Sequence, residues 1–246
     1  MVKNFKLTIQ YDGSLYHGWQ RQNGLRTIQG EIENAIAKMT GQKISLQGSG
    51  RTDAQVHAIG QVANFTCETD LSAEVFRKGI NSLVQEDIVI TACRLVHDTF
   101  HARFDAKSKT YHYRILNREL PSPICRQYAW FLRKSLDIAA IRSAIPHLVG
   151  THDFKAFEGA GSPRCHTVRQ VMQADFITRP SGYCIFKIEA DGFLRYMVRN
   201  IVGTLIAVGR GKITPDGFKQ VLTSRDRGRG GVTAPAHGLF LMKVTY

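Results

Sequence analysis

The sequence lacks paired cysteines, an apolar leader and any long apolar run. Its cysteines are widely spaced and form no Cys-x-x-Cys pair, which argues against a disulfide framework and against a zinc or redox motif; they are Cys67, Cys93, Cys125, Cys165 and Cys184. No stretch of about 18 apolar residues occurs, and the first residues do not resemble a secretion signal. We therefore expect a cytoplasmic protein that does not span a membrane, with most of its cysteines as buried free thiols.

Polar low-complexity tracts are also absent, and acidic residues are few. Hydrophobic residues form 43% of the 246 residues, a composition typical of a globular protein that can bury a core. The 33 lysines and arginines exceed the 20 aspartates and glutamates, which gives a formal net charge of +13. This surplus suits binding of a polyanion such as RNA, and it equally suits a surface that only keeps the protein soluble.

Hydrophobic periodicity predicts the element order βαββαβ in the first half of the chain. Residues that alternate with polar neighbours, or that follow turn signals, predict strands at 5–11, 44–47, 61–67 and 88–95. Apolar residues at helical spacing predict one helix over 28–39, with Thr27 as its cap and Gly41 as its end, and another over 72–83.

The second half repeats this order in pattern, without identity of residues. Strands are expected at 111–115, 168–177, 183–190 and 239–244, and helices at 136–148, at 194–205 and after Thr214. The predicted fold class is α+β, with two ferredoxin-like βαββαβ halves whose antiparallel sheets meet around a central basic cleft. We expect domains at residues 1–104 and 105–246.

The segment 47–58, between two predicted strands, combines glycines with Arg51, Asp53 and His57. In most loops of this kind the aspartate accepts a backbone hydrogen bond in a turn, so these residues alone do not make Asp53 catalytic. Asp53 and His57 would also suit a metal-dependent phosphodiesterase. The histidines of the chain are scattered and lack zinc-site spacing, so packing is favoured over metal ligation.

Four regions, in the same order, resemble the tRNA pseudouridine synthase A family. They read Tyr-Asp-Gly at 11–13 with Gly-Trp-Gln-Arg-Gln at 18–22; Gly-Arg-Thr-Asp-Ala at 50–54 with Val-His-Ala at 56–58; Phe-His-Ala-Arg-Phe at 100–104; and Phe-Leu at 193–194 with Met-Val-Arg-Asn-Ile-Val-Gly at 197–203 and Thr-Ala-Pro-Ala-His-Gly-Leu at 233–239. The resemblance covers the whole chain. One departure is Gln55, where the family usually has glycine; if this position needs a positive φ, glutamine costs about 1 kcal/mol or more.

The resemblance implies an enzyme that isomerises uridine to pseudouridine at positions 38, 39 and 40 of the tRNA anticodon arm. It assigns the nucleophilic attack to Asp53, and a carboxylate suits covalent catalysis that divides one hard step into two. Whether Asp53 attacks C1′ of the ribose or C6 of the uracil is not encoded in the sequence. The reaction is a redox-neutral isomerisation, for which neither a metal nor an organic cofactor is expected. The resemblance also implies a homodimer.

Further site residues follow from the same resemblance. Arg199 lies among apolar helix residues, where an unpaired guanidinium is costly, and we expect Asp53 as its partner instead of solvent or a structural contact. Tyr111 would stack on the target uracil and help to remove the C5 proton, although most tyrosines in such strands only pack. Arg51 would help to turn the nucleotide out of its stack, unless it is an ordinary phosphate contact or surface residue.

The basic, glycine-rich segment 225–231 suits contact with a phosphate backbone through Arg227 and Arg229, or a solvated loop. A non-catalytic RNA-binding protein is the alternative function, because RNA-recognition domains are also built from βαββαβ units. The aromatic-rich RNP1 consensus of such domains is absent from the sequence.

Overall fold

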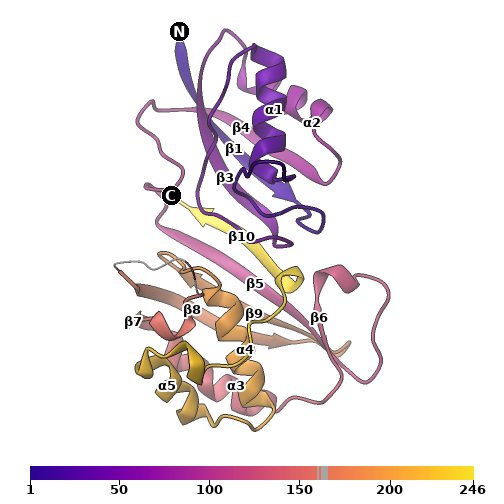
Figure 1. Ribbon diagram of the computed structural model, residues 1–246, viewed down its shortest axis with the longest axis vertical. Coiled ribbons are helices and arrows are strands. Elements are labelled where there is room, and N and C mark those ends of the chain that lie inside the picture. Colours follow the sequence, from indigo (N-terminus) through magenta and orange to yellow (C-terminus); the bar gives the residue numbers. More distant parts are fainter. Residues whose placement is uncertain (160, 162–165) are drawn as a thin grey trace. The chain divides into compact units, whose positions relative to one another are not determined.

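The computed structural model describes residues 1–159, 161 and 166–246 (Figure 1). The chain is mixed α and β, with mostly antiparallel strand pairing, and it divides into two compact units: Met1–Lys107 with Phe240–Tyr246, and Ser108–Leu239. The predicted domains were 1–104 and 105–246, so the last seven residues group with the other unit. Cys165 lies outside the described residues. No helix of the described part is both long and apolar enough for a membrane span.

The first unit is a sheet with two helices. Its elements are β1 (Val2–Tyr11), α1 (Ile28–Thr40), β2 (Gln47–Gly48), β3 (His57–Glu68), α2 (Ala73–Leu83), β4 (Ile88–Val96) and, from the end of the chain, β10 (Leu239–Thr245). The sheet order is β4-β1-β3-β10, and β2 also pairs with β3. β10 runs parallel to β3 and pairs Phe240 with His57, whereas β2 pairs Gln47 with Asn64. β10 therefore pairs with the first residues of β3, and β2 pairs with its middle.

Local sequence explains the helices of this unit. The Thr27 side chain accepts a hydrogen bond from the Gly30 amide at the start of α1, and Gly41 ends the helix with φ of 70°, as expected from the sequence. Ser72 caps α2 in the same way. Phe76 of α2 packs against Phe5 and Phe65, with ring centroids 4.8 and 5.2 Å apart. This cluster fixes α2 on one face of the sheet.

The second unit also combines a sheet with helices. Its elements are β5 (Ser108–Asn117), β6 (Trp130–Leu132), α3 (Ile138–Ala144), β7 (Gly150–Asp153), β8 (Val168–Thr178), β9 (Tyr183–Ala190), α4 (Met197–Gly209) and α5 (Pro215–Ser224). The sheet order is β5-β9-β8-β7, all antiparallel, and β6 runs parallel to β5. In α4 every residue except Arg199 and Ala207 is buried, so α4 forms the centre of this unit.

Several predicted elements have different bounds. The strand expected at 44–47 is only the two-residue β2, and β3 begins at His57 instead of residue 61. The helix expected over 136–148 ends at Ala144 and continues as a tighter 3-10 turn to Leu148, because Pro146 has no amide hydrogen to donate. The short strands β6 and β7 were not predicted.

Candidate active site

The loop that carries Asp53 is fastened to β3 at its beginning. The buried Ser49 donates its amide to the Val62 carbonyl at 2.7 Å and its hydroxyl to Oε1 of Gln61 at 2.7 Å. The amide group of Gln61 in turn donates to the carbonyl of Gly50 at 3.0 Å. Because Gln61 is itself fully buried in the strand, the first residues of the loop have a fixed position relative to the sheet.

Thr52, the residue before Asp53, is held from two sides. Its hydroxyl forms a buried hydrogen bond of 2.8 Å with the Tyr11 hydroxyl of β1, and its carbonyl accepts from the Trp19 amide at 3.0 Å. Burial raises the pKa of Tyr11, so its hydroxyl stays protonated at neutral pH. Gly18 has φ of 94°, and a Cβ atom there would lie 2.6 Å from the Thr52 carbonyl oxygen. Only glycine permits this close approach.

The residues after Asp53 form a tight turn. The Val56 amide donates to the Asp53 carbonyl at 3.2 Å, and the Gln55 amide donates to the Tyr16 carbonyl at 3.3 Å. Gln55 has φ of 65°, so the position that the family usually fills with glycine does require the left-handed conformation. Asp53 itself is half-buried. Backbone hydrogen bonds on both sides therefore hold its carboxyl group on a rigid loop.

His57, the first residue of β3, takes part in packing. Its ring is buried and stacks on Phe240, with centroids 4.6 Å apart. Its Nδ1 lies 3.0 Å from Oδ1 of Asp12 and 3.1 Å from the Gly13 amide. These two contacts exclude each other, since Nδ1 donates to a carboxylate only with a proton and accepts from an amide only without one. We favour acceptance from Gly13, because this buried amide would otherwise lose its partner, and Asp12 Oδ1 already accepts from the amide and hydroxyl of Ser14.

Within residues 1–159, 161 and 166–246, no group of three or more His, Cys, Asp or Glu side chains is arranged to hold a metal ion.

Tyr111 lies on β5 in the second unit, opposite Ile188 of β9. The residue is 7% exposed, and its ring meets that of Phe193 edge to face, with centroids 5.0 Å apart and an interplanar angle of 82°. The contact fixes the plane of the Tyr111 ring, which is what a stacking surface for a base requires.

Arg199 lies in the first turn of α4. Its Nε donates to the Ala234 carbonyl at 2.7 Å, and its own carbonyl accepts from the Ala234 amide at 3.1 Å. The guanidinium carbon lies 4.8 Å from the centre of the Tyr196 ring. We expected Asp53 as the partner of this guanidinium; within the second unit it contacts a carbonyl and an aromatic face. Asp53 belongs to the other unit, so its pairing with Arg199 stays a prediction.

Tyr196 was missed by the sequence analysis. It has φ of 59°, a conformation that is rare for bulky residues, and α4 therefore begins at Met197 instead of residue 194. Its ring also lies under Arg195, at 4.7 Å, and packs closely on Gly159, where a Cβ atom would lie 2.4 Å from the ring. No sequence signal marked this residue, because its strain and its contacts exist only in the folded chain.

The arginines expected to bind substrate have different surroundings. Arg51 is exposed at the start of the Asp53 loop, and Arg229 is exposed as well. Arg227 has structural partners, because its guanidinium donates to Oδ1 of Asn200 and to the hydroxyl of Thr233, both at 3.1 Å. Asn200 in turn donates to the Phe157 carbonyl at 2.8 Å. Arg227 therefore fastens the basic segment 225–231 to α4.

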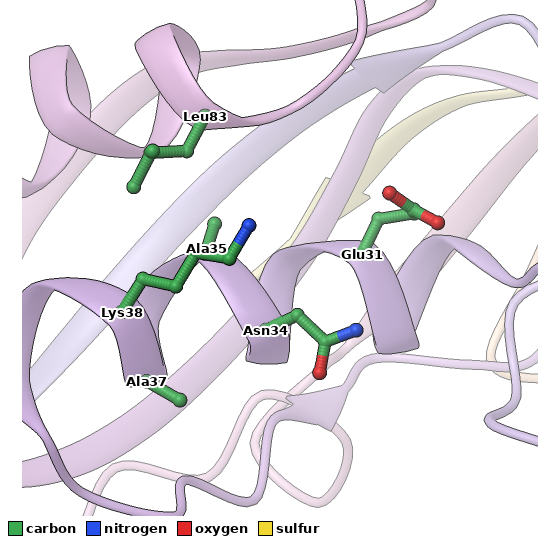
Figure 2. A pocket seen from close by; sticks show the side chains of 6 residues that line it. All are labelled: Glu31, Asn34, Ala35, Ala37, Lys38 and Leu83. Atoms are coloured by element: carbon green, nitrogen blue, oxygen red, sulfur yellow. The ribbon is translucent and has the colours of Figure 1, made fainter.

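A hollow of about 440 Å³ lies elsewhere in the first unit, along the outer face of α1 and the end of α2 (Figure 2). Its lining residues are Glu31, Asn34, Ala35, Ala37, Lys38 and Leu83. None of them belongs to the Asp53 loop, so this hollow is not part of the candidate site.

Comparison with known proteins identifies the family. A family model described as tRNA pseudouridine synthase matches residues 7–105 and 144–246, which is more than half of the chain. The chain belongs to the tRNA pseudouridine synthase family. The matched ranges include Asp53 and Arg199, whereas Tyr111 lies between them.

Relatives support this assignment over the full length. The tRNA pseudouridine synthase A proteins of Thermoanaerobacter sp. strain X514 and of Acetivibrio thermocellus are each 44% identical over 245 residues, covering 100% of both chains. The tRNA pseudouridine synthase A 2 of Bacillus cereus strain ZK / E33L is 42% identical over 246 residues, with the same coverage. A chain in the crystal structure of an archaeal box H/ACA sRNP Nop10-Cbf5 complex is 11% identical with a TM-score of 0.35, and the match covers 82% of this chain and 44% of that one.

The left-handed conformation of Gln55 predicts that this family member carries avoidable strain. Gln55→Gly should raise the free energy of unfolding by about 0.5–1 kcal/mol, because glycine adopts φ of 65° without a steric cost. Urea denaturation measures this change. Gln55→Ala is the matched control, since it keeps the Cβ atom and should bring no gain. Equal free energies of unfolding for the two variants would contradict the claim that the positive φ of Gln55 is strained.

Proposed function

We propose that the protein is an isomerase that converts uridine to pseudouridine at positions 38, 39 and 40 of the tRNA anticodon stem-loop, with Asp53 as its nucleophile. Two findings support this function: membership of the family, and 42–44% sequence identity over the full length to proteins named tRNA pseudouridine synthase A or A 2. The observation that carries the role of Asp53 is its loop, in which backbone hydrogen bonds on both sides fix a half-buried carboxyl group. Such rigid placement is what nucleophilic catalysis requires.

The chemistry is a rearrangement without net oxidation or reduction. The N1–C1′ bond of uridine breaks, the uracil turns, and a C5–C1′ bond forms; C5 loses a proton and N1 gains one. The carboxylate of Asp53 would form a transient covalent bond to the ribose or to the base, and this divides the exchange into two easier steps. No step transfers electrons to or from the enzyme, so the proposal includes neither a metal nor an organic cofactor.

Tyr111 is proposed to stack on the turned uracil and to assist removal of the C5 proton. Its ring is buried and is oriented by Phe193, so it offers a preformed surface at little entropic cost. Its hydroxyl would accept the C5 proton only transiently. This suits a C5 proton that becomes acidic once the new C5–C1′ bond has formed.

Arg199 is proposed to pair with Asp53 and to keep the carboxylate ionised when RNA covers the site. A guanidinium has five N–H donors, and Nε uses one of them on the Ala234 carbonyl. The remaining donors suffice for a carboxylate, while the Ala234 contact and the Tyr196 ring fix the direction of the side chain. Charge-assisted pairing of this kind would also orient the nucleophile.

RNA binding is proposed to use exposed cations. Arg51 stands next to Thr52 on the catalytic loop and is proposed to help turn the nucleotide out of its stack. Arg229 is proposed to contact phosphate. Arg227 is proposed to do the same with the donors that its bonds to Asn200 and Thr233 do not use. The net charge of +13 supplies long-range attraction for tRNA.

We further propose that both halves are ferredoxin-like, that their sheets meet around a basic cleft, and that the enzyme acts as a cytoplasmic homodimer. The order β1-α1-β2-β3-α2-β4 in the first unit supports the first point. The second unit has the order β5-α3-β8-β9-α4 with β6, β7 and α5 as additions, and the last strand of the chain, β10, groups with the first unit.

Asp53→Asn should abolish chemistry while leaving the fold and tRNA binding in place. The amide is nearly the same size as the carboxylate, but its oxygen does not form the covalent adduct. Release of tritium from C5 of labelled uridine in tRNA measures isomerisation, and we expect a rate at least about a thousandfold below wild type. Thermal melting and a tRNA-binding measurement test the fold and the affinity.

Asp70→Asn is the matched control for this experiment, because it makes the same chemical change at an exposed aspartate. Its rate should equal that of wild type. A folded Asp53→Asn protein that releases tritium within about tenfold of the wild-type rate, ~1.4 kcal/mol in barrier, would exclude Asp53 as the nucleophile. Binding without release in the wild-type protein would favour the non-catalytic RNA-binding alternative.

Arg199→Ala should lower kcat by about a hundredfold or more and change tRNA affinity much less. A carboxylate without a nearby cation holds its proton more tightly. The Asp53 nucleophile of the variant would then be ionised only at higher pH, and its residual rate should rise with pH where the wild-type rate is flat. Arg210→Ala, at an exposed arginine just after α4, is the control and should change neither kcat nor tRNA affinity. Near-normal turnover of Arg199→Ala at neutral pH would rule out the pairing.

Arg227→Ala and Arg229→Ala should behave differently. Loss of the bonds to Asn200 and Thr233 should cost Arg227→Ala about 1–2 kcal/mol of folding stability. The folding stability of Arg229→Ala should stay within about 0.5 kcal/mol of wild type. This variant should bind all tRNAs more weakly to the same degree, and the slope of log K against log[salt] should be smaller in magnitude by about one. Denaturation and binding at several salt concentrations measure both effects. A changed target position in Arg229→Ala would mean that this residue selects the uridine.

A further inference from the structure

One segment that resembles the family has no role in the proposed chemistry: Phe-His-Ala-Arg-Phe at 100–104. In the first unit it forms a tight turn that closes on itself. The His101 amide donates to Oδ2 of Asp105 at 2.9 Å, and the Asp105 amide donates to the His101 carbonyl at 3.1 Å. Nδ1 of His101 accepts from the amides of Arg103 and Phe104, at 3.1 and 3.4 Å. Four amides, those of residues 101, 103, 104 and 105, therefore find their acceptors within the turn.

The turn is also tied to the sheet below it. The Ala102 amide donates to Oδ1 of the buried Asn64 at 2.8 Å, and the Tyr246 hydroxyl donates to the Ala102 carbonyl at 2.7 Å. The side-chain amides of Asn4 and Asn64 donate to the Phe100 carbonyl, at 2.9 and 3.2 Å. The backbone of the turn is thus held in a fixed position on the sheet.

The turn presents an aromatic ring. Phe104 is 73% exposed, and no other aromatic side chain appears among the strongly exposed large hydrophobic residues of the described chain. The His101 ring lies beside it, with centroids 4.3 Å apart, and the Arg103 guanidinium lies 5.5 Å from its centre. A single exposed apolar residue usually has no function. A preorganised ring with a cation beside it differs, because this pair has the composition of a site that binds single-stranded nucleic acid.

We propose that Phe104 is a stacking platform for an unpaired nucleobase of the RNA substrate, with Arg103 in contact with a neighbouring phosphate. The proposal rests on the proposed function and extends it to a second base. Asp53 and Phe104 lie on separate segments of the first unit, the loop before β3 and the turn after β4. The base on Phe104 is therefore one other than the reacting uridine.

Charge favours RNA over a second copy of the protein as the occupant. Arg103 and Lys107 are exposed in and next to the turn, and the Lys6 ammonium lies 3.9 Å from the centre of the Tyr246 ring that anchors the turn. A second chain would bring its own charge of +13, and like charges oppose that association. An RNA strand brings phosphates to the cations and a base to the ring.

Binding of fluorescent RNA decamers by Phe104→Ala, Phe104→Trp and wild type tests the proposal. One decamer is single-stranded and the other is the same sequence in a duplex. Phe104→Ala should weaken binding of the single strand about tenfold and leave the duplex within about twofold, since paired bases offer no free face. Phe104→Trp should bind at least as well as wild type. Leu120→Ala, at a residue that is 67% exposed, is the matched control and should change neither affinity.

Turnover separates this proposal from the function on which it rests. With full-length tRNA, Phe104→Ala should raise KM about tenfold and keep kcat within about twofold of wild type. If Phe104→Ala is active and binds the single strand as tightly as wild type does, the stacking platform is overturned and the proposed function is not. If the wild-type protein releases no tritium, the proposed function itself is overturned. An equal loss for both decamers, or a changed sedimentation coefficient of Phe104→Ala without RNA, would assign the ring to folding or to self-association instead.

Discussion

The buried hydrogen bond between the Tyr11 and Thr52 hydroxyls, 2.8 Å long, is the contact on which the candidate site depends. It ties the residue before Asp53 to the first strand of the chain. The Trp19 amide and the glycine at position 18 secure the same residue from the other side. Two other parts of the sequence thus converge on Thr52, one on its hydroxyl and one on its carbonyl, and they limit the movement of the carboxyl group of the next residue. Without Tyr11 the buried Thr52 hydroxyl would lose this partner, and the bond from the Trp19 amide would remain.

Backbone strain accompanies two of the three proposed catalytic residues, Asp53 and Arg199. Four residues other than glycine have positive φ in the described chain, and two of them, Gln55 and Tyr196, lie close in sequence to Asp53 and Arg199. Gln55 closes the turn after Asp53, and Tyr196 supplies the ring under Arg199. Such conformations persist only where the surroundings over-determine them, and they gather at functional sites. The other two, Cys125 and Arg225, show that positive φ by itself does not mark a site.

Periodicity and capping predicted α1, α2 and the long strands, because these depend on neighbours in sequence. The two-residue β2 and the short β6 and β7 were beyond such patterns, since their pairing is decided by distant strands. The family resemblance suggested Asp53, Tyr111 and Arg199 as site residues, which stay predictions. It could not reveal that Arg227 binds Asn200 and Thr233, or that the Tyr196 ring lies against Arg199. The same holds for the anchored turn of Phe104, whose partners lie at positions 4, 64 and 246.

The most direct test maps pseudouridine in tRNA from cells without this gene and from the same cells that produce either the wild-type protein or Asp53→Asn. Pseudouridine should be missing at positions 38, 39 and 40 in the deletion, return with the wild-type protein and stay missing with Asp53→Asn. The rest of the tRNA should keep its pseudouridines throughout. Unchanged modification at those three positions in the deletion, or its return with Asp53→Asn, would contradict the account.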